Sequence, residues 1–508
     1  MKAPDLDLAA IAPLCAVALG AVLIPLLDVL LGRTKTFLSR PVTEAWAGTV
    51  MSLATTGVLL VALVMCFDAA GSAPRVFNRD HPMILMDGMT NFLNIVILIG
   101  SLLTALASGK FLADLSINRG EYYALLLAAV LGMMLLVAAT DLMMLFVGLE
   151  LMSIPVYAMA GFRRDSLRSN ESALKYFLVG SFASAILLYG IALIYGATGT
   201  LSLREIGARF DVDDPVLLIG SGLLLVGLAF KIATVPFHQW APDVYEGAPT
   251  TVSGLMATTV KVAAFAALIR VFRMAFGSID ELLYAALWVM AVLTMTVGNL
   301  MAIIQQNTKR MLAYSSVAHT GYLLVGILVG TQVGISAVLF YLLAYTFMTL
   351  GAFGVVAVLA QAGQERERIE DLAGLANSRM FLAVVMTICM VSLAGIPGTA
   401  GFMGKFYIFR AAVEQAFATG SSSLIWLAVI GVLNSAVSLV YYLRVPMVMF
   451  MREPEPGQEP DRSGTFEGLV LAVCAVAVIL LGIWPEDLNL ILTRVDVLHW
   501  ASVASAAP

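Results

Sequence analysis

Long apolar stretches alternate with short polar or Gly/Pro-rich joints along the whole of this 508-residue chain. A helix needs about 20 apolar residues to cross the roughly 30 Å hydrocarbon core of a bilayer. Windows of that length recur fourteen times, at residues 8–31, 43–67, 88–109, 121–139, 141–161, 172–197, 215–244, 249–273, 281–304, 311–330, 333–361, 380–417, 421–450 and 465–484. The pattern predicts an all-α polytopic membrane protein with about 14 transmembrane helices.

Two of the predicted segments carry signals that interrupt a helix. The seventh contains AFKIATVPFHQW, in which Pro236 closely follows Lys231. The twelfth would form a helix of about 57 Å if it were continuous, and it contains SLAGIPGTAGFMGKF, with Pro397 before Lys405. Proline breaks a helix, and we expect the glycines of the second motif to help unwind it: Gly395, Gly398, Gly401 and Gly404. Many ion carriers build a site from broken helices at mid-membrane.

Basic residues in the joints predict the orientation of the chain. The joints after odd-numbered spans contain 16 Lys and Arg residues, whereas the other side, with both tails, contains 8, among them Arg270. Because such residues gather on the cytoplasmic side, both termini are expected outside the cytoplasm. Further basic residues fall within spans: Lys175, Lys231, Lys261, Lys405 and Arg410. We expect Lys175 and Arg410 to reach the membrane interface.

Composition excludes several classes of function. Hydrophobic residues make up 60% of the chain and charged residues 12%, against about 25% charged residues in soluble domains. The net charge of −5 and the lack of a basic cluster with interleaved aromatics exclude a nucleic-acid surface. The 4 cysteines have no CxxC spacing, and there is no GxGxxG or Walker loop. We therefore expect no metal or cofactor in this chain, so that any redox cofactor is held by another protein.

Ionisable residues recur near the centres of predicted spans. Glu150 follows Asp141 by nine residues, or about 13 Å of helix, which is close to half of the hydrocarbon core. Lys231, Lys261 and His319 lie near the centres of their own segments. A charged side chain at this depth costs about 2.5–3.5 kcal/mol on insertion scales, so such residues indicate a functional site.

The spacing of these residues predicts an internal repeat. Glu150 and Lys231 lie on the fifth and seventh spans, and His319 and Lys405 lie on the tenth and twelfth. Units of five helices account for this spacing, and an odd number of crossings inverts the second unit. The predicted regions are a three-helix region, a first repeat, a second repeat and a last helix with its tail, at 1–120, 121–275, 276–450 and 451–508.

Some of the candidate residues have structural alternatives. Glu150 could hydrogen-bond between helices, and His319, beside hydroxyl residues, could be a satisfied interior histidine. Lys405 could snorkel to the interface if its helix is short. His238, just past the first break, is a further candidate for the relay, with a helix cap or a loop contact as its alternative.

The chain resembles the antiporter-like membrane subunits of the proton-pumping NADH:quinone oxidoreductase, respiratory complex I, over about residues 87–450. Four separated motifs carry the resemblance in the same order: GLELMSIPVYAMAGF, AFKIATVPFHQWAPDVYEGAPTTVSGLMATTVKVAAF, NTKRMLAYSSVAHTGY and SLAGIPGTAGFMGKFYIF. Among three paralogous branches, His319 in its motif and a lysine at position 405 are typical of the N branch. The M branch usually has a glutamate there, and the L branch continues into a long lateral helix, for which we expect no room after Trp484.

The resemblance implies fourteen helices with two inverted repeats, a bacterial inner membrane, and neighbouring membrane subunits. It also implies FMN and iron–sulfur clusters in partner subunits. Glu150 would pair with Lys231 as the charge switch of a first half-channel, Lys261 would be the central relay, and His319 with Lys405 would form the second half and its exit. A nearby carboxylate stabilises a buried ammonium, and its withdrawal favours release of a proton.

Two other functions compete with this hypothesis. A subunit of a multisubunit Na+/H+ antiporter uses the same fold, although the N-type motif with His319 argues against it. A passive spacer that only joins neighbouring subunits would be more stable with apolar residues in place of the central charges.

Overall fold

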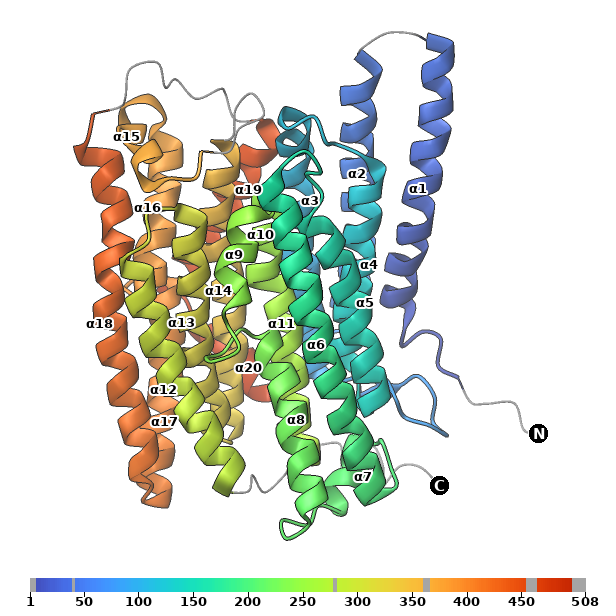
Figure 1. Ribbon diagram of the computed structural model, residues 1–508, viewed down its shortest axis with the longest axis vertical. Coiled ribbons are helices and arrows are strands. Elements are labelled where there is room, and N and C mark those ends of the chain that lie inside the picture. The colour runs from blue at the N-terminus through green and yellow to red at the C-terminus, as the bar shows by residue number, and fades with distance from the viewer. Residues whose placement is uncertain (1–5, 39–41, 277–280, 360–365, 454–463, 496–508) are drawn as a thin grey trace.

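The computed structural model describes residues 6–38, 42–276, 281–359, 366–453 and 464–495. This part of the chain forms a bundle of long helices, most of them running nearly along the long axis of the molecule (Figure 1). The α-helices are α1 (Ala12–Leu38), α2 (Val42–Asp68), α3 (Gly88–Asp114), α4 (Gly120–Ala138), α5 (Leu142–Ala160), α6 (Leu167–Thr198), α7 (Leu203–Ala208), α8 (Pro215–Lys231), α9 (Trp240–Gly247), α10 (Thr250–Leu255), α11 (Lys261–Arg270), α12 (Glu281–Ile303), α13 (Thr308–Leu328), α14 (Gln332–Val358), α15 (Leu375–Ser378), α16 (Met380–Ala394), α17 (Ala400–Thr419), α18 (Ser422–Met451), α19 (Thr465–Ile483) and α20 (Glu486–Arg494).

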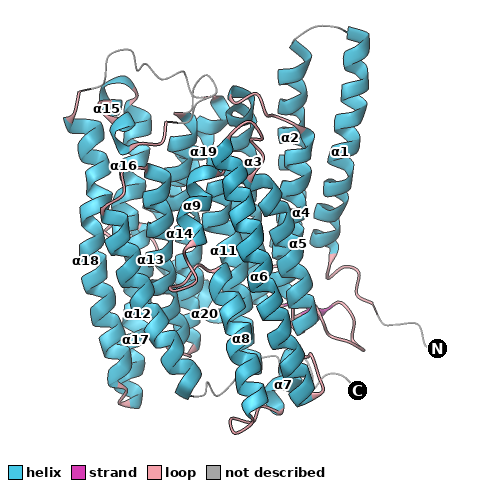
Figure 2. Ribbon diagram, viewed as in Figure 1, coloured by secondary structure: helices cyan, strands magenta, loops and turns pink. Residues whose placement is uncertain are grey.

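Shorter elements interrupt or join these helices. The π-helical turns η1 (Met256–Val260) and η2 (Val271–Ala275) continue α10 and α11, and η3 (Ile369–Leu372) is a 3-10 turn. Figure 2 shows how little strand accompanies the helices. In the described residues, β1 (Arg75–Val76) pairs antiparallel with β2 (Leu85–Met86), with Arg75 opposite Met86.

The helices confirm the predicted all-α membrane fold. Twelve spans in the described residues are long and apolar enough to cross a membrane. The two remaining crossings are the split pairs α8–α9 and α16–α17. Together they correspond to the fourteen predicted segments. The apolar pattern did not predict α7, α20 or the β1–β2 hairpin, because short amphipathic or polar elements do not form long hydrophobic windows.

Both predicted helix breaks are present. The first follows Lys231, the last residue of α8, and ends where α9 begins at Trp240. The second separates the end of α16 from the start of α17 and contains Pro397.

The glycines of the second break have two different roles. Gly395 and Gly398 adopt left-handed backbone conformations, with φ of 86° and 87°, which suits glycine. Gly401 and Gly404 lie inside α17, so the expectation that they unwind the chain is wrong. A Cβ on Gly401 would come within 1.9 Å of Ser392 O, and one on Gly404 within 2.1 Å of the Tyr341 ring. These two glycines allow close packing.

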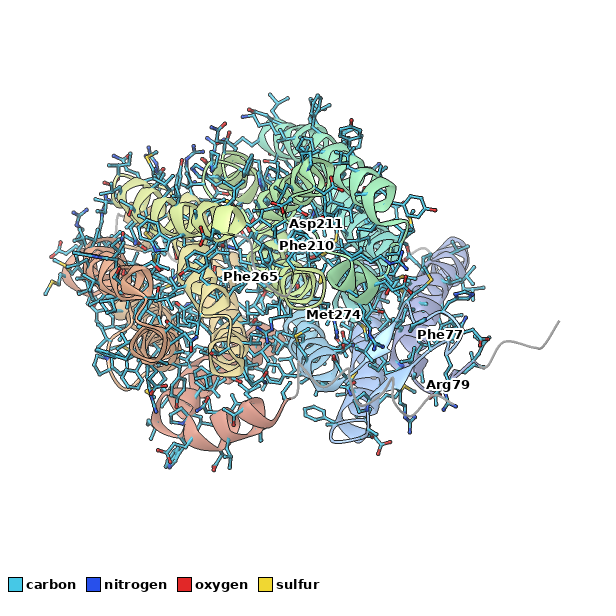
Figure 3. All side chains as sticks on the ribbon, turned by 90° about the horizontal axis from the view of Figure 1, so that it is seen from below. Phe77, Arg79, Phe210, Asp211, Phe265 and Met274 are labelled. Carbon is cyan, nitrogen blue, oxygen red and sulfur yellow. The ribbon has the colours of Figure 1, made fainter. Side chains whose placement is uncertain are left out.

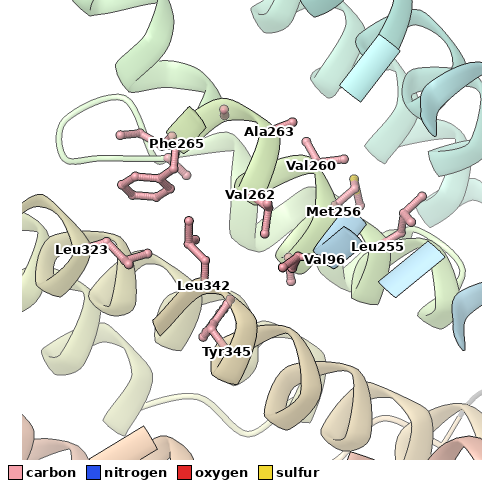
Figure 4. Close-up of a cluster of buried hydrophobic side chains, with 14 of the residues drawn as sticks. Val96, Leu255, Met256, Val260, Val262, Ala263, Phe265, Leu323, Leu342 and Tyr345 are labelled. Carbon is pink, nitrogen blue, oxygen red and sulfur yellow. The ribbon is translucent and has the colours of Figure 1, made fainter. Parts of the chain in front are cut away.

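The centre of the bundle is formed by the eighth, tenth and eleventh spans. In the most apolar stretch of each span, the share of residues that are buried is 100% for Thr250–Ala275 and for α13, and 89% for α14. The corresponding share is 28% for α1 and 33% for α18. Figure 4 shows apolar side chains from this centre, among them Val262 and Phe265 of α11, Leu323 of α13 and Leu342 of α14. In the view from below, Met274 lies near the middle of the projection and Phe77 toward the side of the N-terminal helices (Figure 3).

Arg270 lies inside α11 and not in a joint between spans, which corrects the sequence-based assignment. Its side chain is 3% exposed and donates to Asp87 Oδ1 at 2.9 Å and to Val137 O at 2.9 Å. Asp87 also caps α3 by accepting from the Thr90 N–H at 2.8 Å. The Arg270 side chain therefore joins α11 to α3 through the ion pair and to α4 through the hydrogen bond. Loss of either partner would leave a buried charge uncompensated.

In two pairs of neighbouring helices, glycines allow the helix backbones to come close together. On α4, a Cβ at Gly132 would meet Met152 N at 2.2 Å, and on α5 a Cβ at Gly148 would meet Leu136 N at 2.7 Å. On α12 and α13, Gly298 and Gly321 are equally close to the facing backbone, at 2.6 Å and 2.7 Å. Small residues allow membrane helices to pack backbone against backbone. The α4–α5 and α12–α13 pairs occupy corresponding positions in the two predicted repeats.

We predict that Gly132→Leu destabilises the protein by at least about 1–3 kcal/mol, the usual range for overpacking, because backbone atoms cannot move aside as a flexible side chain can. The measurement is the amount of assembled complex on native gels and its thermal dissociation temperature. Gly222→Leu on α8 is the control, since a Cβ there meets nothing within 4 Å. Equal behaviour of the two variants would contradict the prediction.

Candidate proton-relay site

Four cationic or ionisable side chains are buried in the middle of the bundle. Lys231, Lys261 and Lys405 are 4%, 2% and 4% exposed, and His319 is 1% exposed. They come from α8, α11, α17 and α13. Glu150 lies near the middle of α5 and is partly buried. The structure therefore buries four residues of the predicted set and leaves Glu150 partly buried.

The backbone of the first break is hydrogen-bonded to side chains of the second predicted repeat. Thr320 on α13 donates from its hydroxyl to Ile232 O at 2.9 Å. Thr294 on α12 accepts from the Val235 N–H at 3.0 Å. Irregular backbone survives at membrane depth only where protein or water satisfies its polar groups. The two threonines meet this requirement and attach the end of α8 to α12 and α13.

Lys231 is surrounded by hydroxyls and aromatic rings. Its Nζ donates to Ser153 Oγ at 2.7 Å and to the Tyr176 hydroxyl at 3.5 Å. It also lies 5.4 Å and 5.3 Å from the ring centroids of Tyr157 and Tyr176. Tyr176 in turn stacks on Trp240 of α9, with centroids 4.4 Å apart. These contacts replace part of the hydration that the ammonium would have in water.

Glu150 is turned toward a different partner from Lys231. Its Oε1 accepts a hydrogen bond from Ser184 Oγ on α6. In the described part of the chain, the ion pairs within 4.0 Å do not include Glu150 with Lys231. The charge pair that the resemblance implies is therefore open in this structure: Glu150 is bound to Ser184, and Lys231 is bound to Ser153 and Tyr176.

Lys261 binds the helix that carries His319. Its Nζ donates to Ser316 O at 2.7 Å, to Ser316 Oγ at 2.5 Å and to Thr320 Oγ1 at 2.9 Å. Thr320 therefore contacts both Lys261 and the carbonyl of Ile232, the residue after Lys231. The π-helical turn η1 ends immediately before Lys261, and such turns are frequent at functional sites.

His319 lies among tyrosines. Its Nδ1 is hydrogen-bonded to the Tyr341 hydroxyl, and its Nε2 is 2.8 Å from the Tyr442 hydroxyl. Tyr442 also contacts Ser315. Both ring nitrogens have hydrogen-bond partners, which agrees with the alternative that His319 is a satisfied interior histidine. A histidine between two hydroxyls can also act as a proton shuttle, accepting a proton at one nitrogen and releasing one from the other.

Lys405 does not snorkel to the interface. Its Nζ donates to Leu393 O and Ala394 O, each at 3.0 Å. These carbonyls form the C-terminal end of α16, where the helix dipole favours a cation. The Nζ also lies 4.9 Å from the centroid of the Tyr322 ring, which makes an edge contact with His319 at 5.6 Å. One aromatic ring thus separates Lys405 from His319.

Comparison with known proteins identifies the family of this arrangement. The family model described as NADH:quinone oxidoreductase/Mrp antiporter, TM, matches residues 139–438. NADH-quinone oxidoreductase subunit N of Trichlorobacter lovleyi is 47% identical over 407 residues, which is 79% of this chain and 82% of that protein. The chain belongs to this family.

Solved structures of the family have the same fold. A chain of respiratory complex I from Thermus thermophilus with bound aureothin matches with a TM-score of 0.78 and 35% identity, over 94% of this chain and 98% of that one. A chain of the Mrp complex from Dietzia sp. matches with a TM-score of 0.80 and 22% identity, over 98% and 99%. At that identity, the second likeness concerns the fold alone.

The remaining residues singled out from the sequence lie outside the contacts among the buried lysines and His319. His238 lies in the first break, where its carbonyl accepts from the Ala241 N–H at 2.9 Å, while its buried Nδ1 has no hydrogen-bond partner in the described residues. Lys175 is 44% exposed and pairs with Glu171 and Asp243 at 2.6 Å and 3.0 Å. Arg410, at 58% exposure, pairs with Glu414 at 2.7 Å.

The sequence analysis did not predict the hydroxyl partners of the charged groups. Ser153 lies one helical turn after Glu150, and Ser316 and Thr320 flank His319 in the sequence. The sequence signal that could have identified these partners is a hydroxyl residue next to, or one helical turn from, a membrane-embedded ionisable residue. Ser184, Tyr341 and Tyr442 had no such signal, because they reach the site from other helices.

Among the described residues, no group of three or more His, Cys, Asp or Glu side chains could hold a metal ion. The polar atoms around the lysines are hydroxyl and carbonyl oxygens, which suit an ammonium group.

We predict that Thr320→Val lowers coupled turnover by about tenfold, whereas Thr320→Ser retains most of it. Valine keeps the shape but removes the hydroxyl partner of Ile232 O and one of the two hydroxyl partners of Lys261. A buried carbonyl left unsatisfied in this way costs about 1–3 kcal/mol. The measurement is NADH-driven proton uptake in vesicles containing the reconstituted complex.

Thr387→Val is the matched control for this prediction, because the Thr387 hydroxyl binds only its own helix, at Ala383 O. Full activity of Thr320→Val in an assembled complex would show that the hydroxyl bridge is dispensable.

Proposed function

We propose that this chain is a proton-translocating membrane subunit of an NADH:quinone oxidoreductase, and that its buried ionisable residues form the proton relay. The observation that carries the proposal is the burial of three lysines and a histidine, linked through α13, in the middle of a membrane bundle. The Trichlorobacter lovleyi relative with the name NADH-quinone oxidoreductase subunit N, which is 47% identical, supports the assignment. Other subunits carry electrons from NADH to quinone.

The proposed relay has two halves that meet at α13. Glu150 and Lys231 form the switch of the first half, because approach of the carboxylate stabilises the ammonium and its withdrawal favours the neutral amine. Lys261 passes the proton toward His319 on the helix to which it is bonded. Lys405 then receives it, and the carbonyls at the end of α16 stabilise the charged form. His238 is a secondary candidate at the first break.

The proposal places the chain in a bacterial inner membrane beside other membrane subunits of complex I, with both termini on the periplasmic side. The excess of Lys and Arg in the joints after odd-numbered spans supports this orientation. FMN and iron–sulfur clusters belong to partner subunits, since this chain has no clustered cysteines and no nucleotide-binding loop.

A subunit of a multisubunit Na+/H+ antiporter is the alternative. The Dietzia Mrp chain supports the shared fold, and the subunit N relatives favour the first assignment. Copurification with NADH dehydrogenase activity that needs no sodium would favour the oxidoreductase. Sodium-dependent proton exchange without such activity would favour the antiporter.

The test of the proposed function is Glu150→Ala in the intact complex. We predict that NADH-driven proton pumping falls about tenfold or more and that coupled quinone reduction also slows, because Lys231 loses the carboxylate that stabilises its charge. Assembly should persist, since Glu150 is only partly buried.

Glu414→Ala is the control for the Glu150 variant, because this exposed carboxylate pairs only with Arg410 on its own helix. Normal pumping by an assembled Glu150→Ala complex would reduce Glu150 to a structural role.

A second prediction concerns Lys405. Lys405→Arg keeps the positive charge, but a guanidinium does not release its proton at physiological pH, so pumping should fall about as far as in Lys405→Ala. A cation needed only to bind the carbonyls of α16 would tolerate arginine better than alanine. The measurement is proton uptake by the reconstituted complex, with Arg410→Ala on the same helix as control.

A further inference from the structure

The two charged groups of the proposed switch, Glu150 and Lys231, are hydrogen-bonded to different hydroxyl side chains. Ser184 on α6 donates to Glu150 Oε1, and Lys231 Nζ donates to Ser153 Oγ at 2.7 Å. Ser153 is fully buried and uses its single proton to bind Leu149 O on its own helix. Ser153 can therefore accept from Lys231 but has no proton free to pass onward. Ser184 instead directs its proton at the carboxylate.

A small cavity borders both Ser184 and Lys231. Its volume, counted as room for the centre of a water molecule, is about 10 Å³, and its walls include Tyr157, Gly180 and Gly227. That is near the smallest space that holds one water. A buried water also needs polar partners, and two border this cavity. The Lys231 ammonium can donate to the water, and the Ser184 hydroxyl can accept from it. Apolar walls alone would leave such a cavity dry.

Two glycines in the walls of the cavity allow close helix packing, Gly180 between α6 and α5 and Gly227 between α8 and α6. A Cβ at Gly180 would come within 2.3 Å of the Tyr157 hydroxyl, and one at Gly227 would come within 2.4 Å of Leu187 Cβ. A larger residue at either position would displace a wall of the cavity.

We propose that Ser184 and one water in this cavity form a proton wire between Lys231 and Glu150, so that a proton can pass between the two residues while they are not paired. This inference rests on the proposed function of the pair. The Lys231 N–H donates to the water, the water donates to Ser184 Oγ, and Ser184 donates to Glu150 Oε1, so every donor has one acceptor.

The transfer along this wire is balanced. One N–H bond of the Lys231 ammonium breaks, and its proton joins the water, which gives one of its own protons to Ser184. Ser184 gives its former hydroxyl proton to Glu150, where a new O–H bond forms. The products are a neutral amine and a neutral carboxylic acid. No charge then remains on either group, which suits a low-dielectric interior.

The experiment compares Ser184→Ala, Ser184→Thr and Ser181→Ala in the intact, reconstituted complex. Ser181 lies one turn earlier on α6 and is exposed, so its loss should change nothing. Ser184→Ala should slow NADH-driven proton pumping by about tenfold or more, because the carboxylate loses a charged hydrogen bond and the wire loses its middle member. Ser184→Thr retains the hydroxyl and should restore most of the rate.

Infrared difference spectra on NADH addition give a readout that a structural role would not change. A protonated-carboxyl band that disappears in Glu150→Gln reports the protonated state of Glu150. This band should be lost in Ser184→Ala and present in Ser184→Thr and Ser181→Ala. An unchanged band and unchanged pumping in assembled Ser184→Ala would overturn the wire.

The two proposals fail in distinguishable ways. If Glu150→Gln itself leaves pumping unchanged, the proposed function of the pair is wrong. If Glu150→Gln abolishes pumping but Ser184→Ala behaves as Ser181→Ala does, the relay stands and the wire through Ser184 is wrong. Loss of pumping in both Ser184 variants with the band retained would also overturn it, since a structural defect then explains the loss.

Discussion

Broken backbone inside a membrane must find its hydrogen-bond partners in the protein or in water, and this constraint organises the site. At the first break, Thr320 binds the carbonyl of Ile232 and Thr294 binds the N–H of Val235. Both threonines come from the second predicted repeat. The end of α8, and with it Lys231, is therefore held by α12 and α13, because lipid offers no donor or acceptor in their place.

The same helix connects the remaining parts of the proposed relay. Lys261 donates to Ser316 and Thr320, which flank His319 on α13. Because all of α13 except Arg310 is buried, these contacts lie away from lipid. An ammonium in such a place requires oxygen partners, and hydroxyls and carbonyls supply them without a permanent counter-charge. A lysine bound only by neutral oxygens can lose its proton more readily than one in an ion pair.

The sequence was sufficient for the architecture because a bilayer leaves few solutions. Apolar windows located the long spans, and proline with glycine located both breaks, since only helices satisfy their own backbone in lipid. Short elements were missed, as α20 shows, because nine residues do not form a membrane-length window. Gly401 and Gly404 were assigned to the break because their sequence does not distinguish unwinding from close packing. The residues that face them are Ser392, across the break on α16, and Tyr341, on the distant α14.

The sequence by itself identified Glu150, Lys231, Lys261, His319 and Lys405 as ionisable residues within membrane spans, because such groups are costly in lipid wherever the helices pack. The tertiary structure decided their partners. Ser184 reaches Glu150 across 34 positions of sequence, and Ser316 reaches Lys261 across 55. It also decided that Glu150 and Lys231 are apart and that Arg270 is buried with Asp87. Membrane depth follows from position along one helix, whereas hydrogen bonds depend on how several helices are rotated against one another.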